Sequence, residues 1–136
     1  ALVTAAIAND GVMMHPYLVQ RVTRPDGSHV FQRNPRPIRR TMSEATAREL
    51  REHMRAVGDY GFGSVVSSFV SGVPVGGKSG TAEHVPGATP HAWFIAIAPV
   101  ETPRYAVSVM LESGGEGSGP AAQLAGQVLQ AALETE

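Results

Sequence analysis

The chain of 136 residues contains no cysteine, which excludes disulfide bonds and thiolate catalysis. It has no apolar run near the ~18 residues that a membrane-spanning helix needs. The formal net charge is only −1, so the composition predicts no nucleic-acid partner and no attraction to an anionic membrane. What remains is a chain about one domain long, with the average composition of a globular protein and enough residues to bury a core.

Lysine is also nearly missing. Lysine and arginine together number 11, and Lys78 is the only lysine among them. It lies in the run Val75–Glu83, which reads VGGKSGTAE. Lysine supplies a compact, hydrated point charge, whereas arginine supplies a planar fork. A lone surface lysine is usually just solvated, but the flanking glycines and hydroxyls make this one a candidate for a functional role.

The first half of the chain predicts a helix, a hairpin and a second helix. Helical spacing runs from Leu2 to Ile7 and is stopped by Asn9-Asp10-Gly11. Extended runs surround a turn at residues 25–28, and residues 34–40 are expected to form a proline-broken linker. An amphipathic helix follows up to Gly58, capped by a box beginning at Thr41 or by Ser43, and it is broken at Gly61-Phe62-Gly63.

The second half predicts a small antiparallel sheet. Three extended segments cover residues 73–82, 92–100 and 104–112, with links short enough to make them antiparallel neighbours. A glycine-rich loop at residues 114–119 precedes a last helix, whose first turn is expected to hold Pro120. The fold class predicted for the chain is therefore α+β, a helix-flanked antiparallel sheet.

Two interpretations of Lys78 follow from its surroundings. Residues 72–79 match the phosphate-loop pattern GxxxxGK[ST], which would make the protein a nucleotide-binding enzyme. That pattern requires a helix beginning at Lys-Ser, and the two glycines and the proline of residues 80–87 argue against one. The second interpretation places Lys78 on a strand at the edge of a sheet, where Gly80 lets a ligand approach the backbone and free amides can pair with an extended peptide.

The run Lys78–Glu83 resembles the K-[ST]-G-T-A-E element of penicillin-binding proteins, the third motif beside S-x-x-K and S-x-N. Ala5–Gly11 followed by His15-Pro16 resembles the helix and turn of the monofunctional, class B transpeptidases. Ala92–Pro99 is similar to their WFxGxxP strand, and Gly119–Ala122 to the start of their last helix. The resemblance extends over nearly the whole chain. It departs at Asp10, where a glycine is usual, and at Ala96 and Ile97.

This resemblance implies a serine β-lactamase/transpeptidase-like fold and peptidoglycan D,D-transpeptidase activity without a cofactor or metal. Lys78 would be catalytic, holding positive potential at the groove. The hydroxyls of Ser79 and Thr81 would receive the carboxylate of the stem peptide or of a β-lactam, beside Gly80. The Thr81 amide would be one oxyanion-hole donor. Ideal alternation along a strand, however, puts Thr81 on the face opposite Lys78.

The nucleophile of that chemistry is missing from the chain. An S-x-x-K motif ending at Lys78 would need serine at position 75, which is Val75, and no serine is followed two positions later by asparagine. We expect residues 1–136 to be the C-terminal part of a transpeptidase domain, whose upstream segment carries the nucleophile. The implied location is the extracytoplasmic face of a bacterial membrane, with other cell-wall proteins as possible partners. The alternative is a non-catalytic binding module that kept the fold.

Five further side chains are not expected to take part in the chemistry. His84 and His91 flank a loop, but their spacing matches no zinc pattern, and we expect both to be solvated. Glu83 is expected to be structural rather than a base. Trp93 and Phe94 are expected in the core, with one of them at the rim of the groove.

Overall fold

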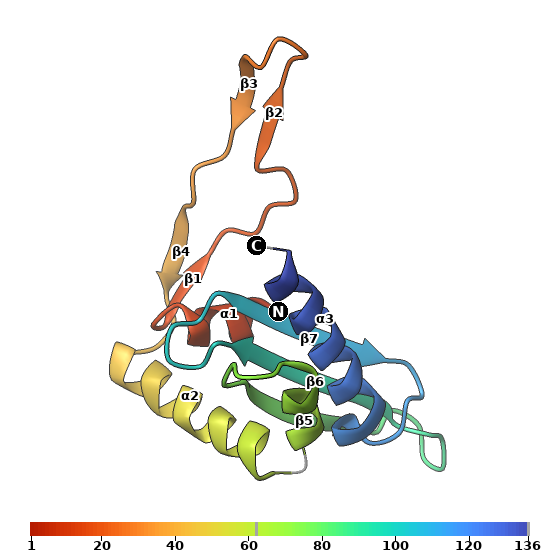
Figure 1. Ribbon diagram of the computed structural model, residues 1–136. Helices are drawn as coiled ribbons and strands as arrows, with labels where there is room; N and C mark the ends of the chain where they lie inside the picture. Colours follow the sequence, from red (N-terminus) through yellow and green to blue (C-terminus); the bar gives the residue numbers. More distant parts are fainter. Residues whose placement is uncertain (62, 136) are drawn as a thin grey trace.

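A computed structural model gives the structure of the chain and describes residues 1–61 and 63–135 (Figure 1). The expected break at Gly61-Phe62-Gly63 includes Phe62, which lies outside the described residues. The elements in chain order are α1 (Leu2–Ala8), β1 (Val12–Met14), β2 (Arg21–Thr23), β3 (His29–Gln32), β4 (Pro37–Arg40), α2 (Glu44–Asp59), the 3₁₀ segment η1 (Ser64–Phe69), β5 (Gly76–Ala82), β6 (His91–Ala98), β7 (Tyr105–Leu111), the short wound segment η2 (Gly117–Ala121) and α3 (Ala122–Glu134).

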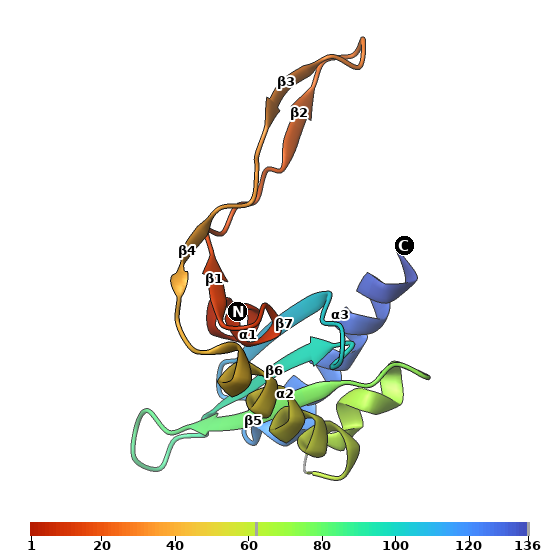
Figure 2. The same cartoon turned by 90° about the vertical axis from the view of Figure 1, so that its left-hand side faces the viewer.

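The central element is a three-stranded antiparallel sheet in the order β5-β6-β7, as the sequence predicts. Helices flank it on both faces, so the α+β fold class is confirmed (Figures 1 and 2). In the register, Lys78 lies opposite Ile95 and Thr81 opposite Ala92. Among the described residues β5 pairs only with β6, so the strand that carries Lys78 forms an edge of the sheet.

One face of the sheet packs against α3 and η1. Phe94 and Leu129 are fully buried there, and burying a side chain of this size contributes roughly 1.5–3 kcal/mol. A Cβ at Gly77 would lie 2.6 Å from the Phe94 ring, which shows that the odd-numbered positions of β5 face this side. The same core explains Gly126 of α3, where a Cβ would lie 2.6 Å from the Phe69 ring.

The other face packs against α1 and α2 through Ile7, Met54 and Ile97. A Cβ at Gly76 would lie 3.1 Å from the Met54 Cβ, so the even-numbered positions of β5 face this side. The buried side chain of Arg51 on α2 links that helix to α1 and to the turn after it. Its Nη1 donates to the Ile7 carbonyl at 2.9 Å and to Asp10 Oδ1 at 2.8 Å.

Residues 12–40 form a two-part arm that projects from the body of the chain (Figures 1 and 2). The expected hairpin is confirmed, with β2 and β3 paired around the turn at residues 25–28. The expectation that residues 34–40 form only a linker was wrong, because Pro37–Arg40 is strand β4, paired with β1. Proline is tolerated as the first residue of such an isolated edge strand, where its missing N–H leaves no ladder bond broken.

Smaller boundary predictions were corrected in three places. Ser43, not a box starting at Thr41, caps α2: its Oγ accepts from the Thr46 amide at 3.0 Å. Thr41 Oγ1 instead donates to the Gly11 carbonyl at 3.0 Å. Strand β5 begins at Gly76 rather than at residue 73, and Pro120 lies in η2, ahead of α3. None of the described helices is long and apolar enough to cross a membrane.

Candidate active site along the edge strand

The Lys78 side chain extends from the edge strand into solvent. Its Nζ donates to the Ser79 carbonyl at 2.7 Å, and within the described part of the chain it makes no salt bridge. Ser79 continues β5, which runs to Ala82 and is followed by a loop and then by strand β6. The phosphate-loop alternative is therefore wrong, because no helix N-terminus follows Lys-Ser to hold a phosphate.

The hydroxyls of Ser79 and Thr81 are open to a ligand. Ser79 is half-buried and Thr81 is exposed, and neither side chain bonds to another described residue. These two hydroxyls lie on the α3 side of the sheet, whereas Lys78 and Gly80 lie on the α2 side. The Thr81 side chain therefore lies on the face opposite Lys78, as the alternation along the strand predicts. The Lys78 ammonium nevertheless reaches the backbone of Ser79, so the positive charge lies at the strand itself.

An apolar hollow of about 340 Å³ lies beside Lys78 on the α2 side of β5. Its walls come from α1, α2 and β6 and include Ile7, Leu50, Met54 and Ile95. The hollow therefore places apolar side chains beside the only lysine in the chain, at the edge of β5.

Trp93 and Phe94 of β6 are adjacent in sequence and point to opposite faces of the sheet. Phe94 is fully buried in the core, as expected, whereas Trp93 is 40% exposed and lies directly across from Gly80. A Cβ at Gly80 would lie 3.3 Å from the Trp93 Cβ. The indole therefore extends the surface next to the candidate site, on the same face as Lys78.

The two loop histidines lie against each other near the end of β5. Their rings stack with centroids 4.0 Å apart, and His91 Nδ1 accepts from the Ser113 amide at 2.9 Å. The expectation that both are merely solvated was wrong for His91, which is half-buried and fixes a neighbouring loop. In the described residues, no group of three potential metal-binding side chains occurs. Glu83 is exposed and pairs with no described cation, so no structural role for it is seen.

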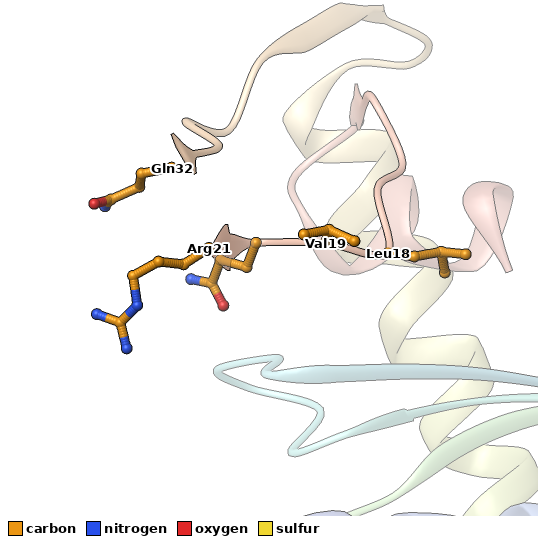
Figure 3. A pocket seen from close by; sticks show the side chains of 5 residues that line it. Leu18, Val19, Arg21 and Gln32 are labelled. Carbon is orange, nitrogen blue, oxygen red and sulfur yellow. The ribbon is translucent and has the colours of Figure 1, made fainter. Parts of the chain in front are cut away.

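A second hollow, of about 460 Å³, lies on the projecting arm (Figure 3). It is lined by Leu18, Val19, Gln20, Arg21 and Gln32. These side chains include no nucleophile and no general base. This hollow therefore offers no candidate catalytic residue.

Comparisons with known proteins show the family of the chain. The family model described as the penicillin binding protein transpeptidase domain matches residues 1–130. The peptidoglycan D,D-transpeptidase PbpA of Mycolicibacterium smegmatis is 39% identical over 119 residues, which cover 85% of this chain and 24% of that protein.

Two solved structures share the fold. The D,D-transpeptidase domain of a peptidoglycan glycosyltransferase from Eggerthella lenta matches with a TM-score of 0.86 and 39% identity, covering 98% of this chain and 31% of that one. Penicillin-binding protein A from M. tuberculosis, solved as a ceftriaxone acyl-enzyme complex, matches with a TM-score of 0.86 and 34% identity, covering 97% and 31%. The chain thus spans about a quarter to a third of the length of these relatives.

Proposed function

Because the chain belongs to the penicillin-binding protein transpeptidase family, we propose that it supplies the Lys-Ser-Gly-Thr edge of a class B D,D-transpeptidase site. In the proposed reaction, a serine on an upstream segment attacks the penultimate carbonyl of a stem peptide ending in D-alanyl-D-alanine. The peptide bond to the terminal D-alanine breaks, and that residue leaves as the free amine. An amine on a neighbouring strand then attacks the ester, which forms the cross-link and releases the serine.

Lys78 would hold the positive potential of the groove. Its ammonium forms no ion pair with a described residue, so no described carboxylate neutralises its charge. In the complete site it would bond to the serine of the S-x-N motif and attract the substrate carboxylate. The free hydroxyls of Ser79 and Thr81 would receive that carboxylate, and Gly80 would let the substrate approach the strand closely.

The direction of the backbone supports a role for the Thr81 amide. The Ser79 carbonyl accepts from the Lys78 ammonium, which indicates that Ser79 presents its polar groups to the open edge of β5. Backbone groups alternate sides along a strand, and the N–H and C=O of one residue point the same way. The Thr81 N–H should therefore share this edge. As an oxyanion-hole donor it would contribute roughly 3–4 kcal/mol to transition-state stabilisation.

The observation that carries this proposal is that one open edge strand holds an ammonium without an ion-pair partner and two hydroxyls without a hydrogen-bond partner among the described residues. The test uses the full-length protein and a fluorescent penicillin, with the acylation rate as the readout. Lys78→Ala should lower that rate severely. Arg48→Ala is the matched control, because Arg48 is an exposed cation that pairs only with Glu44 in the same helix, and it should leave the rate unchanged.

Two results would argue against the proposal in different ways. Equal acylation rates for Lys78→Ala and wild type would show that Lys78 does not act in the site. A folded full-length protein that is not labelled at all would favour the alternative of a non-catalytic binding module. By the same proposal, the site acts on the extracytoplasmic face of the membrane, where peptidoglycan stem peptides and β-lactams are its ligands.

A further inference from the structure

Gly117 of η2 packs directly against the backbone of the candidate site. A Cβ at this position would overlap the carbonyl oxygens of Gly80 and Trp93 and would lie 2.8 Å from the Gly80 nitrogen. Gly117 is buried, and all three of these neighbours are backbone atoms of paired strands. A flexible side chain could move aside, but a paired backbone cannot do so without shifting the strand.

The loop before Gly117 is fastened to the start of β6. The Ser113 amide donates to His91 Nδ1 at 2.9 Å, and the Gly115 amide donates to the Pro90 carbonyl at 3.0 Å. The His91 ring is itself held by stacking on His84. Since His91 lies opposite Ala82 in the register, these contacts hold the loop beside the end of β5.

The position of Gly80 determines the positions of its neighbours. Ser79 and Thr81 flank it directly, and in the proposed function they supply the carboxylate-binding hydroxyls and an oxyanion donor. A donor of this kind acts only when it lies within hydrogen-bond distance of the developing oxyanion. A misplacement of about 1 Å, even one caused far from the chemistry, can lower a rate by about 10²-fold.

We infer that Gly117 and His91 are positioning residues. They hold the Gly80 backbone in the position that lets Ser79 and Thr81 contact the substrate. Gly117 permits the close contact because it has no side chain. His91 holds the loop that delivers Gly117 to that contact. This inference rests on the proposed function, since it concerns the same site, but it assigns roles to residues outside the Lys78–Glu83 run.

The test measures the rate constant and the final extent of acylation by a fluorescent penicillin in the full-length protein. Gly117→Ala should lower the rate constant by about ten-fold or more, while the labelled fraction at saturation stays near that of wild type. Ser118→Ala is the matched control, because it alters the next residue of η2 without adding an atom. A purely structural role for Gly117 would reduce the labelled fraction or the melting temperature and leave the rate constant unchanged, and that result would overturn the inference.

The His91 variants provide an independent test, which decides whether these residues position the site if Gly117→Ala does not fold. His91→Ala removes the acceptor for the Ser113 amide and should lower the rate constant by about three-fold to ten-fold, the value of one hydrogen bond. In His91→Asn, the Oδ1 atom occupies nearly the same place as Nδ1, so this variant should restore most of the rate. An unchanged rate in His91→Ala, or a loss that His91→Asn does not repair, would overturn the inference.

Failure of the proposed function gives a different result. In that case the folded wild-type protein is not labelled, and the question of rate does not arise. A wild-type protein that is labelled, with variants that all react at the wild-type rate, contradicts only the positioning roles. The two outcomes are therefore separated by the wild-type sample in the same experiment.

Discussion

Replacing Arg51 by alanine should destabilise the protein far more than the same change at Arg48, three residues earlier on α2. Arg51 is 8% exposed and donates to the buried Ile7 carbonyl and to Asp10. Losing a charged hydrogen bond and leaving the carbonyl unsatisfied costs about 1.5–3 kcal/mol. Because the Asp10 side chain is 54% exposed, its ion pair adds only about 0.2–1 kcal/mol. The expected loss is therefore about 2–4 kcal/mol.

Arg48→Ala is a close control for this prediction. It makes the same change in the same helix, and both members of its ion pair with Glu44 are more than half exposed, so it should cost about 0.3–0.5 kcal/mol. Asp10→Asn should fall between the two, because asparagine tolerates the positive φ of 49° at this position but loses the charge.

The assay is thermal unfolding of the full-length protein with each substitution, followed by circular dichroism. The expected order of melting temperatures is wild type and Arg48→Ala highest, then Asp10→Asn, then Arg51→Ala. If Arg51→Ala melted together with Arg48→Ala, the proposed link between α1 and α2 would contribute nothing, and the reasoning from burial would be refuted.

Two further predictions concern packing and capping. Phe94→Ala should lower the stability by about 3–5 kcal/mol, because it opens a cavity in the core. The neighbouring Trp93→Ala should cost much less, since Trp93 is 40% exposed. Similar melting temperatures for the two variants would contradict the assigned faces of β6. Ser43→Ala should cost about 1 kcal/mol through loss of the α2 cap, and a Ser43→Asp variant of wild-type melting temperature would support capping as the cause.

Local sequence patterns predicted most of the fold. Alternation and short links identified β5, β6 and β7, and helical spacing identified α1, α2 and α3. Strand β4 was missed because its partner β1 is more than twenty residues away, and two prolines dominated the local pattern. Pairing between distant segments leaves no local signal when the strands are short and exposed, as these are.

The candidate site was predicted in part, since the run around Lys78 could be recognised by its residue types. The contacts that Gly117 and His91 make beside this run could not be predicted. Gly117 belongs to a glycine-rich loop, and nothing in the sequence separates it from the other glycines there. Only the close contact of η2 with Gly80 in the structure distinguishes it. The sequence pattern indicates only a solvated loop residue at His91, because its partner, the Ser113 amide, is 22 positions away in sequence.

The most direct measurement of the central claim is a crystal structure of the full-length protein acylated by penicillin G. We expect the carboxylate of the drug to lie within hydrogen-bond distance of the Ser79 and Thr81 hydroxyls. We also expect the acyl carbonyl oxygen to accept from the Thr81 N–H at the open edge of β5. A drug bound elsewhere, or a Thr81 N–H turned toward β6, would contradict the proposed role of this strand.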